Sequence, residues 1–340
     1  MKLEPANLHT AMIDACLLDV RSPAEYAKGH IPGAISFPLF DDKERARVGT
    51  VYKREGRQSA VTLGLRIVGQ RLANYVEDAT ALAQGKTIIV YCWRGGMRSG
   101  SMAWLLQMSG LEVCTLSGGY KAFRKHTADS IAAIARMVVV GGATGTGKTE
   151  ILHALAARGQ QVIDLEGLAQ HKGSAFGNLT EARQPTTEHF HNLIWRELHS
   201  FDLNQVIWIE DESRTIGSVW IPEVLFRKLR EAPVVVIEKT REERARYLSA
   251  GYGENPLEKL KDGFVRIADR LGGQHANAAL EALERRDFAE AATLALHYYD
   301  KAYTHDLSKR LNQRIYHLNG DQKQFDELAF ALITTKEHYV

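Results

Sequence analysis

Residues 138–149 of this chain read VVVGGATGTGKT. The valines predict a buried strand, and the glycine-rich stretch after them fits the pattern G-x-x-x-x-G-K-[ST] of phosphate-binding loops, which open a helix. Glycines let backbone N–H groups approach phosphate oxygens, the lysine adds a positive charge, and the final hydroxyl can reach a metal ion. The sequence therefore predicts an α/β domain with a phosphate or diphosphate site formed by Gly142, Gly145, Thr146, Gly147, Lys148 and Thr149.

The acidic residue that usually follows a second buried strand in such domains is displaced here. Residues 206–209 are apolar and end on Glu210, where an aspartate is expected, and Asp211 comes one position late. This argues against an ordinary Mg-nucleotide hydrolase and leaves room for another diphosphate ligand. The candidate acids are Asp164, Glu210 and Asp211. Whether a metal binds stays open, with Thr149 as its ligand if the ion is Mg²⁺.

A second strand–loop–helix unit lies upstream. Residues 87–91 predict a buried strand that ends at Cys92, and a glycine-rich turn and a helical pattern follow. Backbone N–H groups converging on the sulfur, the helix dipole and Arg94 or Arg98 would lower the pKa of the Cys92 thiol. The same cradle suits the anionic end of a persulfide or perselenide. We therefore predict that Cys92 is a nucleophile that carries sulfur or selenium.

The length of 340 residues exceeds what one core usually supports, so two domains are expected. We place the first at residues 1–128, a linker at 129–136 and the second at 137–340, with a helical insertion or extension at about 250–311. Both domains are predicted to be α/β with parallel sheets, because apolar strand patterns alternate with helical segments. In the second domain further strands are expected at residues 161–163, 206–209, 233–237 and 314–318.

Composition excludes several classes of protein. Hydrophobic residues make up 45% and charged residues 25% of the chain, which is ordinary for a globular protein. No apolar stretch reaches the roughly 20 residues that a bilayer crossing needs, and the N-terminus lacks a signal-peptide pattern. Three scattered cysteines suit a reducing compartment, and Cys16 and Cys114 are expected to be buried and unreactive. We expect a cytoplasmic protein, no membrane partner, and a monomer.

Although the net charge is only +2, basic residues are concentrated in one stretch of the chain. Between residues 43 and 71 there are eight lysines and arginines against two glutamates. Such a stretch could follow a phosphate backbone or form a solvated face. The residues that we select as nucleic-acid contacts are Arg45, Lys53, Arg54 and Arg57 and, on a later predicted helix, Arg266 and Arg270.

The first domain resembles rhodanese domains. Residues 19–26 (DVRSPAEY) and 29–34 (GHIPGA) are similar to their N-terminal signature, and residues 116–120 (LSGGY) to their C-terminal one. The resemblance covers about residues 10–125 and implies a rhodanese-like parallel-sheet fold.

One departure keeps a different chemistry open. Five residues separate Cys92 from Arg98, whereas the common sulfurtransferase loop has four between its cysteine and a later arginine. Rhodanese-fold phosphatases use the longer loop, so a cysteine phosphatase or arsenate reductase is an alternative. Those phosphatases usually carry a glutamate in the loop, and this loop has none.

The whole chain resembles the bacterial tRNA 2-selenouridine synthase family, in which a rhodanese domain precedes a P-loop domain. The similar stretches are residues 92–99, the phosphate loop, and the segments 48–53, 164–174, 209–213 and 298–303. The resemblance implies that geranyl diphosphate alkylates 2-thiouridine at the tRNA wobble position and that selenium from selenophosphate then replaces the geranylthio group. It also implies no tightly bound cofactor, with Mg²⁺ left open, and two partners, the thiolated tRNA and a supplier of selenophosphate.

Three other functions stay open at this stage. A P-loop kinase or ATPase with a rhodanese domain would turn over ATP without tRNA. A cysteine phosphatase is favoured only by the loop length. A sulfur-carrier adaptor would pass persulfide to a partner and catalyse no geranylation.

Overall fold

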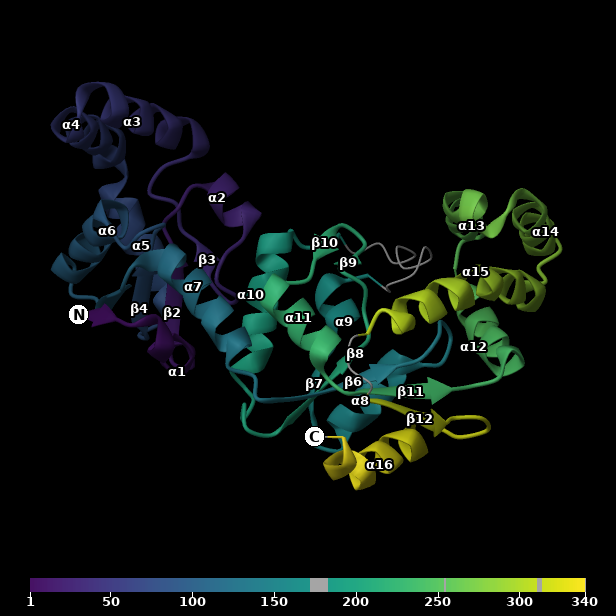
Figure 1. Ribbon diagram of the computed structural model, residues 1–340. Coiled ribbons are helices and arrows are strands. Elements are labelled where there is room, and N and C mark those ends of the chain that lie inside the picture. The colour runs from purple at the N-terminus through teal and green to yellow at the C-terminus, as the bar shows by residue number, and fades with distance from the viewer. Residues whose placement is uncertain (172–182, 254, 311–313, 340) are drawn as a thin grey trace. The chain divides into compact units, whose positions relative to one another are not determined.

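The computed structural model describes residues 1–171, 183–253, 255–310 and 314–339 (Figure 1). These residues form two compact units. The first unit comprises residues 1–130 and 191–199, and the second comprises residues 131–190 and 200–340. In both units the main sheet is parallel, as predicted for an α/β chain.

The first unit is built on a five-stranded parallel sheet with the strand order β1-β5-β4-β2-β3. Its strands are β1 (Lys2–Leu3), β2 (Ala15–Asp19), β3 (Ile35–Ser36), β4 (Thr87–Tyr91) and β5 (Val113–Leu116). Its helices are η1 (Pro5–Asn7), α1 (Leu8–Met12), α2 (Pro23–Lys28), α3 (Asp42–Glu55), α4 (Arg57–Val68), η2 (Gly69–Arg71), α5 (Leu72–Ala83), α6 (Met97–Met108) and α7 (Gly119–Ala132).

The inner strands β2 and β4 are buried on both faces, because helices cover each side of the sheet. Leu18, Ile88 and Val90 pack in one cluster with residues of α5 and α6. The alternate residues Leu17 and Ile89 pack in a second cluster with residues of α1 and α7. This alternation follows from the two-residue period of a strand and explains why these strands are apolar throughout.

Part of helix α10 (Thr187–Leu198) completes the core of the first unit, although it follows the phosphate loop in sequence. Trp195 is 0% exposed and belongs to the cluster behind β4. Its ring meets the edge of Phe123 on α7, with 4.7 Å between the ring centroids. The core of the first unit therefore includes residues 191–199, which the expected boundary at residue 136 places in the second domain.

The second unit contains a five-stranded parallel sheet with the order β12-β11-β6-β8-β7. Its central strand β6 leads into the phosphate loop. The chain passes from β6 to one side of the sheet and later to the other, so the strand order reverses beside β6. Ligands of open α/β sheets bind outside the carboxyl ends of the strands at such a point. The strands are β6 (Arg136–Gly141), β7 (Gln161–Ile163), β8 (Val206–Glu210), β11 (Val234–Glu238) and β12 (Ile315–Asn319).

Helices α8 and α16 cover one face of this sheet and α11 lies on the other (Figure 1). A small antiparallel pair, β9 (Thr215–Ile216) with β10 (Val219–Trp220), precedes α11. Helices α12 to α15 build a separate apolar cluster. The helices are α8 (Lys148–Ala157), α9 (Leu165–Ala169), α11 (Glu223–Glu231), α12 (Arg241–Gly253), α13 (Leu257–Leu271), α14 (Gly273–Glu284), α15 (Phe288–Ser308), α16 (Phe325–Thr335) and η3 (Lys336–His338).

The observed ranges differ from the expected ones in two places. Helix α7 extends to Ala132, so the first half of the expected linker is helical. The helical extension begins at Arg241 rather than near residue 250, and it turns between α14 and α15. There Arg286 adopts a left-handed backbone conformation and the Asp287 side chain accepts a hydrogen bond from the Glu290 N–H, which starts a new helix. In the described residues no helix is long and apolar enough to cross a membrane.

The contribution of Trp195 to the first unit can be tested by Trp195→Ala. Because the ring is buried in that core, its loss should destabilise the first unit by about 3–5 kcal/mol. Hydrogen exchange followed by mass spectrometry should show lost protection in peptides of β4 and α7. Trp104→Ala is the matched control, since Trp104 is 63% exposed on α6 of the same unit. Equal protection in both variants would contradict this account of the core.

Candidate functional site

Cys92 lies directly after β4, at the start of the loop that leads into α6. Its side chain is buried, and its Sγ lies 3.2 Å from the Ser99 Oγ in the first turn of α6. The Ser99 hydroxyl also donates to the Gly96 carbonyl at 3.2 Å. The sulfur is therefore held at a helix N-terminus, where the helix dipole favours an anion.

The glycines after β5 let a second segment pack closely on this loop. Gly119 has a φ of +62°. A Cβ there would collide with the Cys92 carbonyl oxygen and the Gly95 N–H. The Tyr120 N–H in turn donates to the Cys92 carbonyl at 2.9 Å. The C-terminal signature thus packs directly on the cysteine loop, and only glycine permits so close an approach.

The two arginines of the loop have different surroundings. Arg94 is exposed. Arg98 donates to both carboxylate oxygens of Glu25 on α2, at 2.6 and 3.3 Å. Burial alone would raise the pKa of Glu25, but the hydrogen bonds and charge of Arg98 outweigh it and lower that pKa to about 2. Glu25 therefore stays ionised and holds Arg98 beside the loop.

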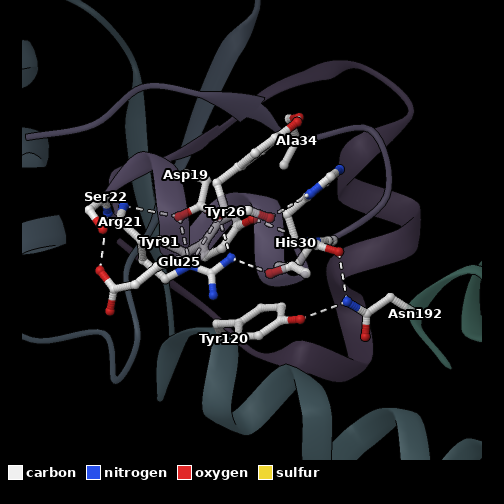
Figure 2. A network of polar contacts seen from close by, with 12 residues as sticks. Asp19, Arg21, Ser22, Glu25, Tyr26, His30, Ala34, Tyr91, Tyr120 and Asn192 are labelled. Atoms are coloured by element: carbon white, nitrogen blue, oxygen red, sulfur yellow. Dashed lines mark hydrogen bonds and ion pairs between the residues drawn. The ribbon is translucent and has the colours of Figure 1, made fainter. Parts of the chain in front are cut away.

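A buried polar network explains the N-terminal signature (Figure 2). Arg21 forms a buried ion pair with Asp19 at 2.6 Å, and its guanidinium lies 3.8 Å from the ring centroid of Tyr120. Asn192 of α10 donates to the Tyr120 hydroxyl and to the His30 carbonyl, both at 2.7 Å. These contacts join the signature to the residues that support the cysteine loop, so they serve to position it.

The phosphate loop of the second unit runs from the end of β6 to the start of α8. Gly145 and Gly147 have φ values of +85° and +80°, in the left-handed region that favours glycine. The Lys148 Nζ donates to the Gly142 carbonyl at 3.0 Å. Thr146 is buried in the loop. This backbone leads into the N-terminus of α8, an arrangement that binds phosphate groups.

Arg244 of α12 supports the loop from outside. Its guanidinium donates to the Thr144 carbonyl at 3.2 Å and pairs with Asp300 on α15 at 2.7 Å. A Cβ at Gly145 would lie 3.0 Å from the Arg244 carbonyl oxygen. Sequence reasoning had assigned no part to Arg244, and it noted the segment 298–303 only as a similarity. The role of Asp300 in that segment is to hold Arg244 against the loop.

A cluster of glutamates lies beside the phosphate loop. Carboxylate oxygens of Glu166, Glu210 and Glu212 all lie within 4.8 Å of one another. The Glu166 side chain accepts a hydrogen bond from the Thr149 hydroxyl at 3.0 Å, and its backbone N–H donates to the Glu210 Oε1 at 2.7 Å. We call these three residues the glutamate trio.

Burial and mutual repulsion change the acidity of the trio. Burial, followed by the charges of Glu212 and Glu166, raises the pKa of Glu210 well above its usual value. Burial and the Glu166 charge also raise the pKa of Glu212 to about 8, although Lys148 acts in the opposite direction. Three carboxylates at this distance cannot all be ionised without a compensating charge.

The structure separates the three predicted acids. Of these only Glu210 belongs to the trio. Asp211, one residue later, forms a buried ion pair with Arg310 at 2.5 Å. Asp164 accepts a hydrogen bond from the Gly167 N–H at the start of α9 and lies 3.0 Å from the His153 Nε2.

Glu166 and Glu212 were missed by sequence reasoning. The signal for Glu212 was its spacing: it follows Glu210 by two residues, so a continued strand period would place both on one side and Asp211 on the other. Glu166 had no such local signal. The similar segment 164–174 contains it, but residues 172–174 of that segment lie outside the described residues.

The predicted nucleic-acid contacts lie on helices of both units. Arg45, Lys53 and Arg54 are exposed on α3, and the exposed Arg57 begins α4. Arg45 also approaches Glu25, with 3.5 Å between its Nη2 and the Glu25 Oε1. Arg45 of α3 and Arg98 of the cysteine loop therefore both contact the carboxylate of Glu25.

The other two predicted contacts lie on α13 of the second unit. Arg266 and Arg270 are both exposed. The Arg270 Nη1 donates to the Tyr298 hydroxyl of α15 at 3.2 Å. Tyr298 also packs against Tyr299, with 5.0 Å between ring centroids.

Comparison with known proteins matches both units. A family model described as "tRNA 2-selenouridine synthase AAA domain" matches residues 135–333, and a rhodanese-like domain model matches residues 4–126. A relative from Hahella chejuensis named tRNA 2-selenouridine synthase is 36% identical over 345 residues, covering 89% of this chain and 88% of its own.

Two further relatives carry the same name. The one from Bordetella petrii is 35% identical and covers 89% of each chain. The one from Cronobacter sakazakii is also 35% identical and covers 91% of each chain. The predicted family resemblance is thus confirmed along both units, and this chain belongs to the tRNA 2-selenouridine synthase family.

Proposed function

We propose that this chain replaces the sulfur of 2-thiouridine at the tRNA wobble position with selenium, in two steps. The observation that carries the proposal is the pairing, in one chain of this family, of a phosphate loop with a cysteine held at a helix N-terminus. The phosphate loop serves the alkylation step and the cysteine serves the selenium step. The supporting partners are a thiolated tRNA and an enzyme that supplies selenophosphate, and the chain acts as a monomer in the cytoplasm.

In the first step the substrate is geranyl diphosphate. The thiocarbonyl sulfur of the base forms a bond to C1 of the geranyl group while the C1–O bond breaks. The electron pair leaves with diphosphate, and the base loses its N3 proton. Gly142, Gly145, Gly147 and the N-terminus of α8 cradle the diphosphate, and Lys148 stabilises the charge that develops on it.

In the second step selenium enters at C2 of the base. Alkylation has turned a poor leaving group into geranylthiolate, which departs as selenium adds. With selenophosphate and water the products are 2-selenouridine, geranylthiol and phosphate. Selenium keeps its oxidation state, so the net exchange needs neither an oxidant nor a reductant.

Cys92 acts in this second step as the residue that carries selenium. Its position after β4, with Ser99 at 3.2 Å and the helix N-terminus beside it, suits a terminal anion such as a perselenide. Forming the S–Se bond of a perselenide on Cys92 removes two electrons from selenide-level selenium and the thiolate, and a disulfide accepts them. Delivery of that selenium to C2 as selenide breaks the S–Se bond and takes two electrons back from a pair of thiols, which regenerates the disulfide and the Cys92 thiol, so the two transfers together are redox-neutral. Arg94 and Arg98 contribute positive charge at the loop.

The phosphate-loop assignment is tested by Lys148→Ala. Removing the positive charge beside the leaving diphosphate should slow formation of the S-geranyl nucleoside by about 100-fold or more. The rate is measured by mass spectrometry of digested tRNA after incubation with geranyl diphosphate. Lys309→Ala, which removes an exposed lysine of the same unit, should retain the wild-type rate. Wild-type geranylation by the Lys148→Ala variant would exclude the assignment.

The role of Cys92 is tested by Cys92→Ala. This variant should accumulate S-geranyl tRNA and form no selenonucleoside, because alkylation does not use the thiol. Cys16→Ala and Cys114→Ala are matched controls, since both cysteines are buried in strands and burial raises the pKa of each thiol. Both controls should form the selenonucleoside. Normal selenation by Cys92→Ala would remove Cys92 from the mechanism.

The predicted tRNA contacts on α3 are tested by the double variant Lys53→Ala, Arg54→Ala. If both side chains contact tRNA phosphates, affinity should fall and the slope of log K against log salt should become shallower by about 1.4–1.8. Filter binding over a salt series measures both. Lys323→Ala with Lys336→Ala removes the same charge from the second unit and should leave the slope unchanged. An unchanged slope in the first variant would mean that α3 is only a solvated face.

A further inference from the structure

The glutamate trio draws its residues from three separate places in the second unit. Glu166 belongs to the first turn of α9, Glu210 ends β8, and Glu212 follows two residues later. Tertiary folding therefore brings them together, and they are not neighbours on one helix face. Their oxygens lie within 4.8 Å of one another, which is close enough to share one ion.

Two residues of the trio, Glu210 and Glu212, are buried. Glu210 is 0% and Glu212 is 8% exposed. In the described part of the chain neither forms an ion pair with a lysine, arginine or histidine. The Glu210 Oε2 is buried and has no hydrogen-bond partner among the described residues. Such a carboxylate oxygen is costly unless a cation or a proton occupies the site.

The neighbours of the trio point to a role at the phosphate loop. The Thr149 hydroxyl, which sequence reasoning selected as a metal ligand, instead donates to the Glu166 Oε2. It therefore orients one carboxylate, as residues behind metal ligands do. Asp211, the aspartate that comes one position later than usual, pairs with Arg310 and so has a charge partner of its own.

We propose that Glu166, Glu210 and Glu212 bind one hard divalent cation of the Mg²⁺ class, in the absence of any phosphate ligand. A set of oxygen ligands selects Mg²⁺, Mn²⁺ or Ca²⁺ over softer metals. In an octahedral Mg²⁺ site opposed ligands lie about 4.2 Å apart and neighbouring ligands about 3.0 Å apart, so oxygens within 4.8 Å of one another must approach by up to about 1.8 Å to bind one ion. The remaining coordination positions stay with water.

The cation also has a place in the geranylation step, a role that rests on the proposed function. Water ligands of Mg²⁺ exchange for phosphate oxygens, so the ion would bridge the trio to a diphosphate held by the loop. It would share with Lys148 the stabilisation of the leaving group. The proposed ligands thus extend the diphosphate site from the loop to the carboxyl end of β8.

The test is an electron paramagnetic resonance titration of the full chain with Mn²⁺ alone, without tRNA or diphosphate. We expect one bound Mn²⁺ per chain, displaced by excess Mg²⁺. Glu210→Gln and Glu212→Gln should each weaken binding by at least about tenfold. Glu150→Gln is the matched control, because Glu150 adjoins Thr149 but is not in the trio. No binding by the wild type, binding of Ca²⁺ only, or equal binding by all variants would overturn the proposal.

Thermal unfolding separates lost binding from lost fold. Mn²⁺ should raise the unfolding temperature of the wild type and not that of Glu210→Gln or Glu212→Gln. In EDTA both variants should unfold cooperatively and at or above the wild-type temperature, since each loses one of three clustered negative charges. A metal-induced rise of equal size in the variants would contradict ligation by the trio.

Binding of inorganic pyrophosphate tests the bridging role of the cation separately from the existence of the cation site. If the ion bridges to diphosphate, pyrophosphate should bind more tightly with Mn²⁺ than with EDTA, and this difference should vanish in Glu210→Gln. Mn²⁺ binding with no effect on pyrophosphate would uphold the site and reject the bridging role. Absence of Mn²⁺ binding would reject the site even if the chain still geranylates tRNA.

Discussion

Strands buried on both faces can present reactive groups only where they end, and this constraint governs both units. Strand β4 is covered by helices on each side, and the first residue after it is Cys92. Strand β6 is central in the other sheet and leads into the phosphate loop. Because each sheet is parallel, every carboxyl end lies along one edge, where helix N-termini also begin. The two proposed anion sites therefore lie at the same structural position in their units.

The support around each site comes from contacts that leave no local pattern. Asp300 holds Arg244 against the phosphate loop, and Asn192 joins Tyr120 to the His30 carbonyl below the cysteine loop. The side chains of Asp300 and Asn192 hold neighbouring groups in place through hydrogen bonds. They fix loops whose glycines would otherwise allow many conformations, and so they pre-organise the N–H groups that face an anion.

The sequence predicted what depends on local order. Apolar strand runs, glycine loops and the helices after them were placed close to their observed positions, because strand burial and loop geometry impose a residue pattern on a few neighbours. It could not predict that Trp195 returns to the first unit or that Glu166 meets Glu210, because these pairings join residues far apart in the chain. Of the acids that the sequence predicted, Asp211 pairs with Arg310, whereas Glu210 lies together with Glu166 and Glu212.

The central claim is that one chain uses the phosphate loop for alkylation and the cysteine for selenium transfer. The most direct measurement is mass spectrometry of nucleosides from 2-thiouridine tRNA incubated with the purified chain, first with geranyl diphosphate and then with selenophosphate. The account predicts S-geranyl-2-thiouridine after the first addition and 2-selenouridine after the second. No change in nucleoside mass at either stage, with the tRNA confirmed as thiolated, would contradict it.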